Sequence, residues 1–505
     1  MMQGFKVSLP EHVPMQYVWP ALGFLFGVQM LEGTHLLTSL TYCAFVLVLV
    51  DAFNTVGGLV YPSGSYIFFV GLLTAGVGGM AKTVLGEPLD SNLFNTQKSL
   101  LVYLAGACAI WGAAKVNVAI RRKRPLLWKT QLTSNVVQAA VGALLFSQFG
   151  WILVPMAYMS TFSQLNRFGP LALLLAVYAN VKKSGGEKSY STFAFLMWVY
   201  FTTVGIFAFS KEAMFTPSVS WVIGATMAGY RLTLRRALFV GVVATILSAI
   251  LAPVSQVGRV YRLDANSNEV AIDLLTHPLR TREIYEMQQS YIREDKGYHW
   301  FDRPQGLLDR MTMLPIDDAL IRRTDRGFSP GILPMETYAA NMIPRYLIGE
   351  KFVYHWGNQY AHEIGMLGAR DMTTGISFSP FGDAYHQMQW WGVTLISFPI
   401  FLMMFFVCDS LAGSTHDTIW ASIYILIFAH TAAEGMMNAP FGAMSVGSVL
   451  VVFAAVMGRY VLPTLGGVLT LSRPAVGPPL PVKPIWHSQR PSLVQSGPRT
   501  IEEKL

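Results

Sequence analysis

One segment of the chain places two titratable side chains on a single helical turn. It runs from Gly375 to Val393 as Gly-Ile-Ser-Phe-Ser-Pro-Phe-Gly-Asp-Ala-Tyr-His-Gln-Met-Gln-Trp-Trp-Gly-Val, with Asp383 and His386 three residues apart. A carboxylate or an imidazole at such a position can remove a proton from a substrate hydroxyl. The alternative is structural: Asp383 caps the following helix, and His386 lies in a membrane interface beside Trp390 and Trp391.

Arginines are concentrated in the polar stretch that leads into this segment. Residues 258–386 hold 12 of the arginines and five of the ten histidines. A guanidinium is a planar fork that matches phosphate oxygens, so a cluster of arginines favours a diphosphate ligand. The alternative is that carboxylates of the same stretch pair with them on a solvated surface. The arginines concerned include Arg280, Arg282, Arg293, Arg303, Arg310, Arg322, Arg323, Arg326, Arg345 and Arg370.

Two further positions combine charge with an apolar neighbourhood. Asn166 and Arg167 precede a run of leucines, which puts an arginine at the mouth of a helix bundle. His430 and Glu434 are four residues apart and therefore share a helix face, where they can form a proton relay or a metal pair. The alternatives are an arginine that reaches the lipid head groups and a His and a Glu that are satisfied by neighbouring residues.

The composition predicts that these residues are positioned by a membrane-embedded helix bundle. Of the 505 residues, 52% are hydrophobic and only 13% are charged, whereas about a quarter are charged in soluble domains. The net charge of +8 is explained by cytoplasmic loops and does not require nucleic acid. Cys43, Cys108 and Cys408 lie in or beside apolar runs, which disfavours disulfide and zinc chemistry.

Twelve segments are long and apolar enough to be predicted as membrane-spanning helices. The fifth contains Gly150 and Pro155 and is expected to be kinked. The predicted spans are 15–33, 35–51, 60–80, 98–119, 134–160, 168–181, 190–209, 217–230, 237–256, 387–407, 417–434 and 442–465.

Basic residues in the short connections predict the orientation of the bundle. They follow the fourth, sixth and eighth spans, so all three clusters fall on one side, which is expected to be cytoplasmic. Both termini are then cytoplasmic, and no cleavable signal peptide is expected at the start. The clusters are Arg121, Arg122, Lys123 and Arg124; Lys182 and Lys183; and Arg231, Arg235 and Arg236.

Four parts are therefore predicted. Residues 1–257 form an N-terminal transmembrane bundle, and 258–386 form a large outer loop domain, because a connection of this length is uncommon unless it is folded or functional. Residues 387–467 form the last three spans, and 468–505 form a proline-rich cytoplasmic tail without apolar periodicity. Neither a Walker loop nor a dinucleotide fingerprint nor a convincing Asp-x-Asp pair is present, which disfavours a nucleotide-sugar enzyme.

At the segment around Asp383 the chain resembles the Wzy-type O-antigen and exopolysaccharide polymerases, which belong to the O-antigen ligase-like superfamily. Their last outer loop is followed by a run similar to Ser-x-Phe-Gly-Asp/Glu-Ala-Tyr-x-x-x-Gly-x-x-Gly. Ser379 and the run from Phe381 to Tyr385 match it in order, and Gly392 supplies a later glycine. Residues 389–391 depart from the pattern, since small residues are usual there.

The resemblance implies an all-α, GT-C-like membrane glycosyltransferase with about 12 transmembrane helices and one large periplasmic loop. It implies polymerisation of undecaprenyl-diphosphate-linked oligosaccharide repeat units on the outer face of the bacterial inner membrane. No cofactor and no metal are expected, and a chain-length regulator is a candidate partner. The arginines proposed for the diphosphate are Arg167, Arg345 and Arg370, and the proposed bases are Asp383, His386, His362 and His355.

Three other functions remain open. An O-antigen ligase-like enzyme would use the same donor but transfer the glycan to another acceptor. A flippase or transporter of the lipid-linked glycan would line a path through the membrane with charge, and the predicted spans contain few such residues. A non-catalytic scaffold of an export complex would use the outer domain to bind partners.

Overall fold

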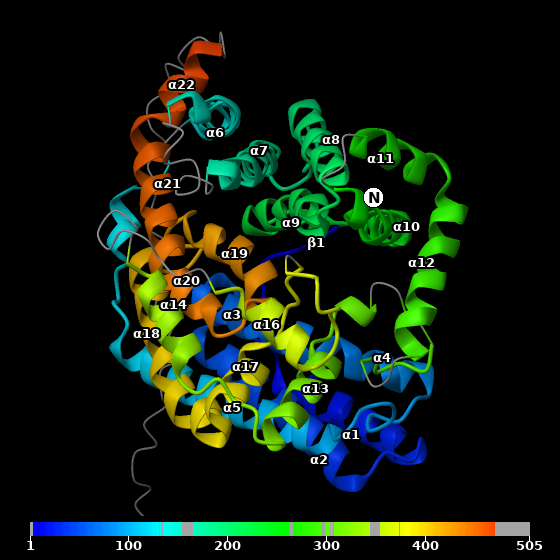
Figure 1. Cartoon of the computed structure of the whole chain (residues 1–505). Helices are drawn as coiled ribbons and strands as arrows, with labels where there is room; N and C mark the ends of the chain where they lie inside the picture. The colour runs from blue at the N-terminus through cyan, green and yellow to red at the C-terminus, as the bar shows by residue number, and fades with distance from the viewer. Residues whose placement is uncertain are drawn as a thin grey trace, which may run out of the picture. The chain divides into compact units, whose positions relative to one another are not determined.

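Helices make up most of the part of the chain that the structure describes (Figure 1). The computed structural model describes residues 4–130, 132, 135–153, 165–262, 266–294, 298–303, 305, 308–343, 354–372 and 374–469. In this part of the chain, strand structure is confined to an antiparallel pair of two-residue strands and to one bridge between Phe378 and Gly435. The predicted all-α class is therefore confirmed.

The first half of the chain contains the following elements: β1 (Phe5–Lys6), α1 (Met15–Leu31), α2 (Leu36–Val56), α3 (Pro62–Gly71), α4 (Val77–Leu85), α5 (Thr96–Ile120), α6 (Val136–Phe149), α7 (Phe168–Lys183), α8 (Thr192–Phe207), α9 (Lys211–Met227), β2 (Arg231–Leu232) and α10 (Leu234–Gly258). A wide π-helical turn, Leu72–Gly76, joins α3 to α4. Short 3-10 turns occupy Gly58–Val60, Leu126–Thr130, Gly150–Leu153 and Arg259–Tyr261.

The second half contains α11 (Ser267–Thr276), α12 (Pro278–Glu294), a 3-10 turn (Leu308–Arg310), α13 (Leu314–Asp325), α14 (Leu333–Asn341), α16 (Trp356–Glu363), α17 (Pro380–Trp391), α18 (Ser397–Ala412), α19 (Ala421–Glu434), α20 (Asn438–Gly442), α21 (Ser448–Tyr460) and α22 (Leu462–Leu469). Two more π-helical turns, Gly392–Ile396 and Ala443–Gly447, lead into α18 and α21.

Apolar helices coincide with the predicted spans. Among the described residues, six helical segments are long and apolar enough to cross a membrane, and each overlaps a predicted span. Shorter apolar helices overlap the predicted fifth, seventh and eleventh spans, and α1, α7 and α9 overlap the other three with 16 or 17 residues each. Residues 154–160 of the fifth span, with the kink expected at Pro155, lie outside the described residues. The six long segments are Leu36–Val56, Pro62–Leu85, Thr96–Ile120, Leu234–Tyr261, Pro380–Ala412 and Asn438–Tyr460.

The three basic connections gather at one end of the bundle, which we call the basic end. Strand β1 pairs with β2, and the backbone N–H of Arg231 donates to Gly186 at 2.7 Å, next to Lys182 and Lys183. The segment after β1 continues to the connection before α3, where the N–H of Leu59 donates to the Pro10 carbonyl at 2.7 Å. The guanidinium of Arg121 reaches the same connection through the Val56 carbonyl at 2.9 Å.

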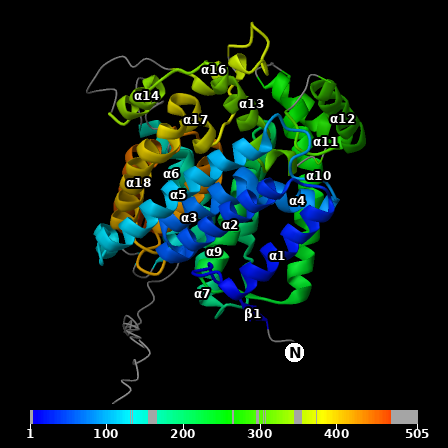
Figure 2. The ribbon, with the colours of Figure 1, turned by 90° about the horizontal axis from the view of Figure 1, so that it is seen from below.

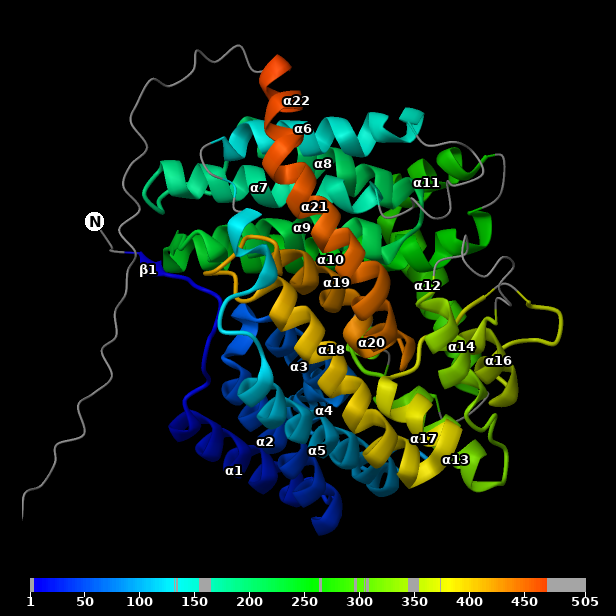
Figure 3. The ribbon, with the colours of Figure 1, turned by 90° about the vertical axis from the view of Figure 1, so that its left-hand side faces the viewer.

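Helices α11 to α14, α16 and the start of α17 lie at the opposite end, away from β1, as the views in Figures 2 and 3 show. We call this the loop end. These helices come from the polar stretch 258–386, and they pack onto the apolar helices within one compact unit, Met1–Thr470.

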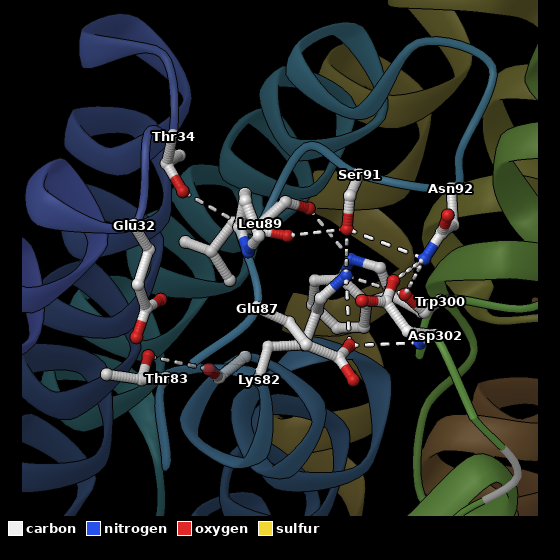
Figure 4. A network of polar contacts seen from close by, with 12 residues as sticks. Glu32, Thr34, Lys82, Thr83, Glu87, Leu89, Ser91, Asn92, Trp300 and Asp302 are labelled. Atoms are coloured by element: carbon white, nitrogen blue, oxygen red, sulfur yellow. Dashed lines mark hydrogen bonds and ion pairs between the residues drawn. The ribbon is translucent and has the colours of Figure 1, made fainter. Parts of the chain in front are cut away.

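A buried lysine of α4 bonds to the polar stretch near Trp300 (Figure 4). Lys82 of α4 is fully buried, and its amine donates to the Trp300 carbonyl at 2.6 Å and to Ser91 Oγ. Glu87 lies 3.5 Å from the same amine and accepts the Asp302 N–H at 3.1 Å. A buried ammonium requires such compensation, so this network fixes the Trp300 region against α4.

Helix α17 is placed on α5 by a close approach at a glycine. A Cβ on Gly106 would lie 2.2 Å from the ring of Phe381, so only glycine admits this ring. Phe381 then packs against Tyr103 of α5, with ring centroids 5.3 Å apart. The α17 backbone breaks at Met388 and Gln389, where Gln389 has a φ of +51°. The first turns of α17 are therefore a short separate helix that precedes α18.

Candidate functional site

Ser379 begins α17 and fixes the position of Asp383. Its hydroxyl accepts the N–H groups of Phe381 and Gly382, and Pro380 occupies the first helical position. The helix cap is thus Ser379, which leaves the carboxylate of Asp383, one turn later, available for other partners.

Asp383 is fully buried and accepts hydrogen bonds from four groups. One oxygen accepts Gln387 Nε2 at 2.7 Å and the Tyr360 hydroxyl at 3.1 Å; the other accepts the Met437 N–H at 2.8 Å and the Tyr338 hydroxyl at 3.3 Å. The donors belong to α14, α16, α17 and the residue before α20. Asp383 therefore connects the polar stretch to the last apolar helices, and its carboxylate has no direct access to solvent.

The two tyrosines beside Asp383 are held in the neutral form. Burial raises the pKa of the Tyr338 phenol well above its usual range, and the charge of Asp383 raises it further. The pKa of Tyr360 is raised by the same two causes in the same order. Both hydroxyls consequently remain hydrogen-bond donors to the carboxylate at physiological pH.

A second buried carboxylate, Asp317, lies against the same helix start. It accepts the Tyr103 hydroxyl at 2.7 Å and the Ser379 N–H at 3.2 Å. A Cβ on Gly382 would lie 2.4 Å from its carboxyl carbon, so α13 and α17 touch at this glycine. Burial raises the pKa of Asp317 to about 7, and the nearby Asp383 also raises it.

From the sequence, Asp317 was counted among the carboxylates that pair with arginines on a solvated surface, whereas it is fully buried. Asp317 shares a face of α13 with Leu314 and Ile321, both fully buried. A carboxylate on the apolar face of an amphipathic helix must find buried partners, which is how it could have been recognised.

His386 is buried between two polar side chains. Its Nε2 lies 3.0 Å from a carboxylate oxygen of Glu363, and its Nδ1 lies 2.8 Å from the Thr324 hydroxyl. The imidazole also packs edge-on against the ring of Tyr360, with centroids 4.6 Å apart. Burial alone would raise the pKa of Glu363, but the hydrogen bond and charge of His386 outweigh it, so the pKa is lowered. Only the Glu363 side of this pair reaches the surface, with 23% of its side chain exposed.

The other predicted bases and diphosphate ligands are more exposed or undescribed. His362 is half-buried and its Nε2 lies 2.8 Å from the Asp371 carbonyl. His355, which precedes α16, and Arg370 are both exposed. Arg345 lies outside the described residues.

Arg167 lies at the start of α7 and belongs to a separate group. Its guanidinium is 2.9 Å from one oxygen of Glu212, the second residue of α9, and His430 Nε2 of α19 is 3.4 Å from the other oxygen. The three side chains are between 29% and 41% exposed. Glu212 was missed by sequence reasoning, because nothing in the spacing shows that the start of α9 meets the start of α7.

An apolar crevice adjoins this Arg167, Glu212 and His430 group. It is narrow, with a volume of about 10 Å³, and Arg167 is the charged residue in its lining. Side chains of α7, α9, α19 and α21 form it, among them Leu171, Leu426 and Leu450. The crevice has room for about one water molecule, so the group presents a cation beside a packed apolar surface rather than beside an open chamber.

Helix α19 connects the Arg167 group with the Asp383 network. One turn beyond His430, Glu434 accepts the Ser377 hydroxyl at 3.4 Å. Phe378 and Gly435 form the single β-bridge seen in the described residues, and the Met437 N–H reaches Asp383. Among the described residues, no direct contact joins Arg167 to Asp383, Arg370 or His362.

The arginines of the polar stretch have several kinds of partner. Arg282 pairs with Glu286 one turn away at 2.8 Å on an exposed surface, as the solvated alternative predicts. Arg322 stacks 4.0 Å from the Phe94 ring, beside a surface pocket of about 400 Å³ that Asp318 and Asp325 also line.

Comparison with other proteins adds no functional residue to this description. Within the described residues, no group of three or more His, Cys, Asp or Glu side chains is arranged to hold a metal ion. The chain matches no protein-family model, no curated protein and no solved structure.

Proposed function

We propose that this chain is a membrane glycosyltransferase that polymerises undecaprenyl-diphosphate-linked oligosaccharide repeat units. The observation that carries the proposal is the Arg167 group beside apolar side chains of α7, α19 and α21. A lipid-diphosphate donor has an anionic head beside a long apolar chain, and this arrangement offers a cation beside apolar side chains. The resemblance around Asp383 supports the same class of reaction.

In the proposed reaction, a hydroxyl oxygen of the acceptor sugar attacks the anomeric carbon of the donor. A new C–O bond forms as the bond between that carbon and the diphosphate breaks, and undecaprenyl diphosphate leaves with the electron pair. Arg167 stabilises the charge that develops on the leaving diphosphate. The proton of the attacking hydroxyl passes to a general base, and the anomeric configuration inverts.

We rank the candidate bases by their exposure and their hydrogen-bond partners. His430 is the imidazole of the Arg167 group, it is 41% exposed, and Glu212 orients it. His362 and His355 also retain access to solvent. Asp383 and His386 are buried and bonded to protein groups, so we assign them to positioning α17.

The proposed reaction requires a defined orientation of the helix bundle in the membrane. About twelve helices would form a GT-C-like bundle in the bacterial inner membrane, with the basic end in the cytoplasm and the loop end in the periplasm. The donor head group would then meet the Arg167 group at the periplasmic surface, and a chain-length regulator is the expected protein partner.

The products formed by the purified protein test the proposal. Given its native undecaprenyl-diphosphate-linked repeat unit in proteoliposomes, the protein should form a ladder of carrier-linked polymers. Transfer of the glycan to a different lipid acceptor would instead indicate a ligase, and movement of an unchanged lipid across the bilayer would indicate a flippase. Either of those results overturns the polymerase assignment.

A further inference from the structure

A second cavity adjoins the basic end of the bundle and shares no lining residue with the crevice beside Arg167. It is a groove of about 670 Å³ between α18 and α21, both of which belong to segments able to span a membrane. Its walls are apolar, with Phe406, Val407 and Leu411 on α18 and Val449, Val452 and Val456 on α21.

The groove is open to the surroundings of the bundle. Val449, Val452 and Val456 follow one another at helical spacing, and they are 69%, 39% and 44% exposed. In a bilayer such a surface faces hydrocarbon, so the occupant that fits it is an acyl chain.

The lining of the groove includes one guanidinium, that of Arg122. Arg122 lines the groove and is exposed, and no carboxylate among the described residues pairs with it. Its neighbour Arg121 differs, because that side chain turns inward to the buried Asp409 at 3.5 Å and stacks on Tyr61 at 4.0 Å. Arg122 is therefore free to bind an anion beside the groove.

Two further arginines, Arg124 and Arg459, add positive charge to the part of the chain around Arg122. Arg124 lies over the ring of Trp128, and Arg459 of α21 donates to the Lys129 carbonyl at 2.7 Å. Trp128 is 44% exposed, as is usual for an aromatic ring at the level of lipid head groups. Arg122 lines the groove, Arg124 lies two residues further along the chain, and Arg459 lies three residues beyond Val456, so these cations suit the head group of an anionic phospholipid and the apolar walls suit its chain.

We propose that this groove is a specific site for an anionic glycerophospholipid, with an acyl chain between α18 and α21 and the phosphate on Arg122. Arg122 lies at the basic end of the bundle, whereas the Arg167 group lies at the starts of α7 and α9, and the two cavities have no lining residue in common. The lipid site is separate from the proposed donor site and does not depend on the proposed reaction.

Lipid retention measures this directly. The protein is reconstituted in nanodiscs of nine parts phosphatidylcholine to one part phosphatidylglycerol, released, and analysed by native mass spectrometry. The parent should retain phosphatidylglycerol in preference to phosphatidylcholine. Arg122→Gln should lower that preference about fivefold, the effect of one basic residue at a membrane surface. Val452→Trp should fill the groove and abolish retention of both lipids there, and Val456→Trp should do the same if the first variant does not fold.

Arg235→Gln is the matched control, since Arg235 is another exposed arginine that follows β2 at the basic end but does not line the groove. It should keep the preference of the parent. Equal retention of both lipids by the parent, or unchanged retention in the tryptophan variants, would overturn the proposal. Displacement of the lipid by millimolar glycerol phosphate would also overturn it, because the site would then recognise a free anion rather than a phospholipid.

Discussion

Glu212 binds Arg167 at 2.9 Å through one carboxylate oxygen and leaves the other oxygen to His430. The Glu212 carboxylate therefore lies between the guanidinium of Arg167, at the start of α7, and the imidazole of His430 on α19. Because both remain partly exposed, a diphosphate can replace Glu212 as the partner of the guanidinium without exposing a buried charge.

Asp383→Asn should destabilise the fold. The asparagine amide group would place its own donors against at least one of the groups that now donate to the carboxylate. We expect the free energy of unfolding in detergent to fall by at least about 2 kcal/mol. Asp273→Asn is the control, since that carboxylate is 56% exposed. A variant as stable as the parent but inactive would instead make Asp383 a catalytic group.

Asp317 should give the fold a distinct dependence on pH. Its pKa is about 7 in the folded chain and 3.8 in the reference state, so the folded chain binds the proton more tightly. The resulting stability is fully present below pH 3.8 and is lost as the pH rises through 7. The pKa of Glu363 is lowered, so its contribution to the free energy of unfolding is fully present above its reference pKa of 4.5 and is lost as the pH falls. This pH dependence is opposite in sign to that of Asp317.

Asp317→Asn isolates that effect, because asparagine mimics the protonated acid. Unfolding free energies of parent and variant, measured from about pH 4 to about pH 8, should converge at the acid end and separate in favour of the variant at the alkaline end. Parallel curves over this range would mean that Asp317 does not titrate there.

Gly382→Ala should disrupt the contact between α13 and α17. The added methyl group would lie 2.4 Å from the carboxyl carbon of Asp317, which is itself held by Tyr103 and Ser379. We expect a loss of roughly 2–3 kcal/mol of stability. Gly375→Ala, where the methyl group meets no atom within 4 Å, should be close to neutral. Equal effects of the two changes in thermal melts would contradict the described packing.

Lys82→Met should cost more stability than the same change at Lys115. Lys82→Met removes a fully buried ammonium, so Glu87 loses its ion-pair partner and the Trp300 carbonyl loses a hydrogen-bond donor. We expect this to cost about 3 kcal/mol of unfolding free energy. Lys115→Met breaks an ion pair with Asp51 whose side chains are 45% and 47% exposed, and it should cost less than about 1 kcal/mol. Chemical unfolding of the two variants in detergent measures the difference, and a reversed order would refute the anchoring role of Lys82.

The sequence predicted the helices better than the contacts between them. Apolar runs such as 98–119 and 237–256 coincide with α5 and α10, because the periodicity and length that define a span are local properties. The start of α17 was misplaced: Asp383 was considered as the cap of a span that begins at residue 387, whereas Ser379 caps a helix that begins at Pro380. In contrast, the partners of Arg167 and Asp383 come from helices distant in the chain, and no local pattern specifies them.

Burial was the main quantity that could not be predicted. Asp383 was expected at a bilayer surface where it could meet a substrate, yet it is fully buried and accepts hydrogen bonds from the hydroxyls of Tyr338 and Tyr360. His386 was expected near water and is instead enclosed by Glu363 and Thr324. Whether a polar side chain is accessible depends on tertiary packing, which a single sequence does not reveal.

The rate of polymer formation by Arg167→Ala tests the central claim most directly. The purified parent, this variant and Arg282→Ala are compared with undecaprenyl-diphosphate-linked repeat units in proteoliposomes, after circular dichroism has verified that each is folded. Loss of a charge that stabilises the leaving diphosphate should slow Arg167→Ala by roughly a hundredfold or more. Arg282→Ala, which removes an exposed pair with Glu286, should match the parent. A folded Arg167→Ala that forms the ladder at the parental rate would contradict the proposed role of Arg167.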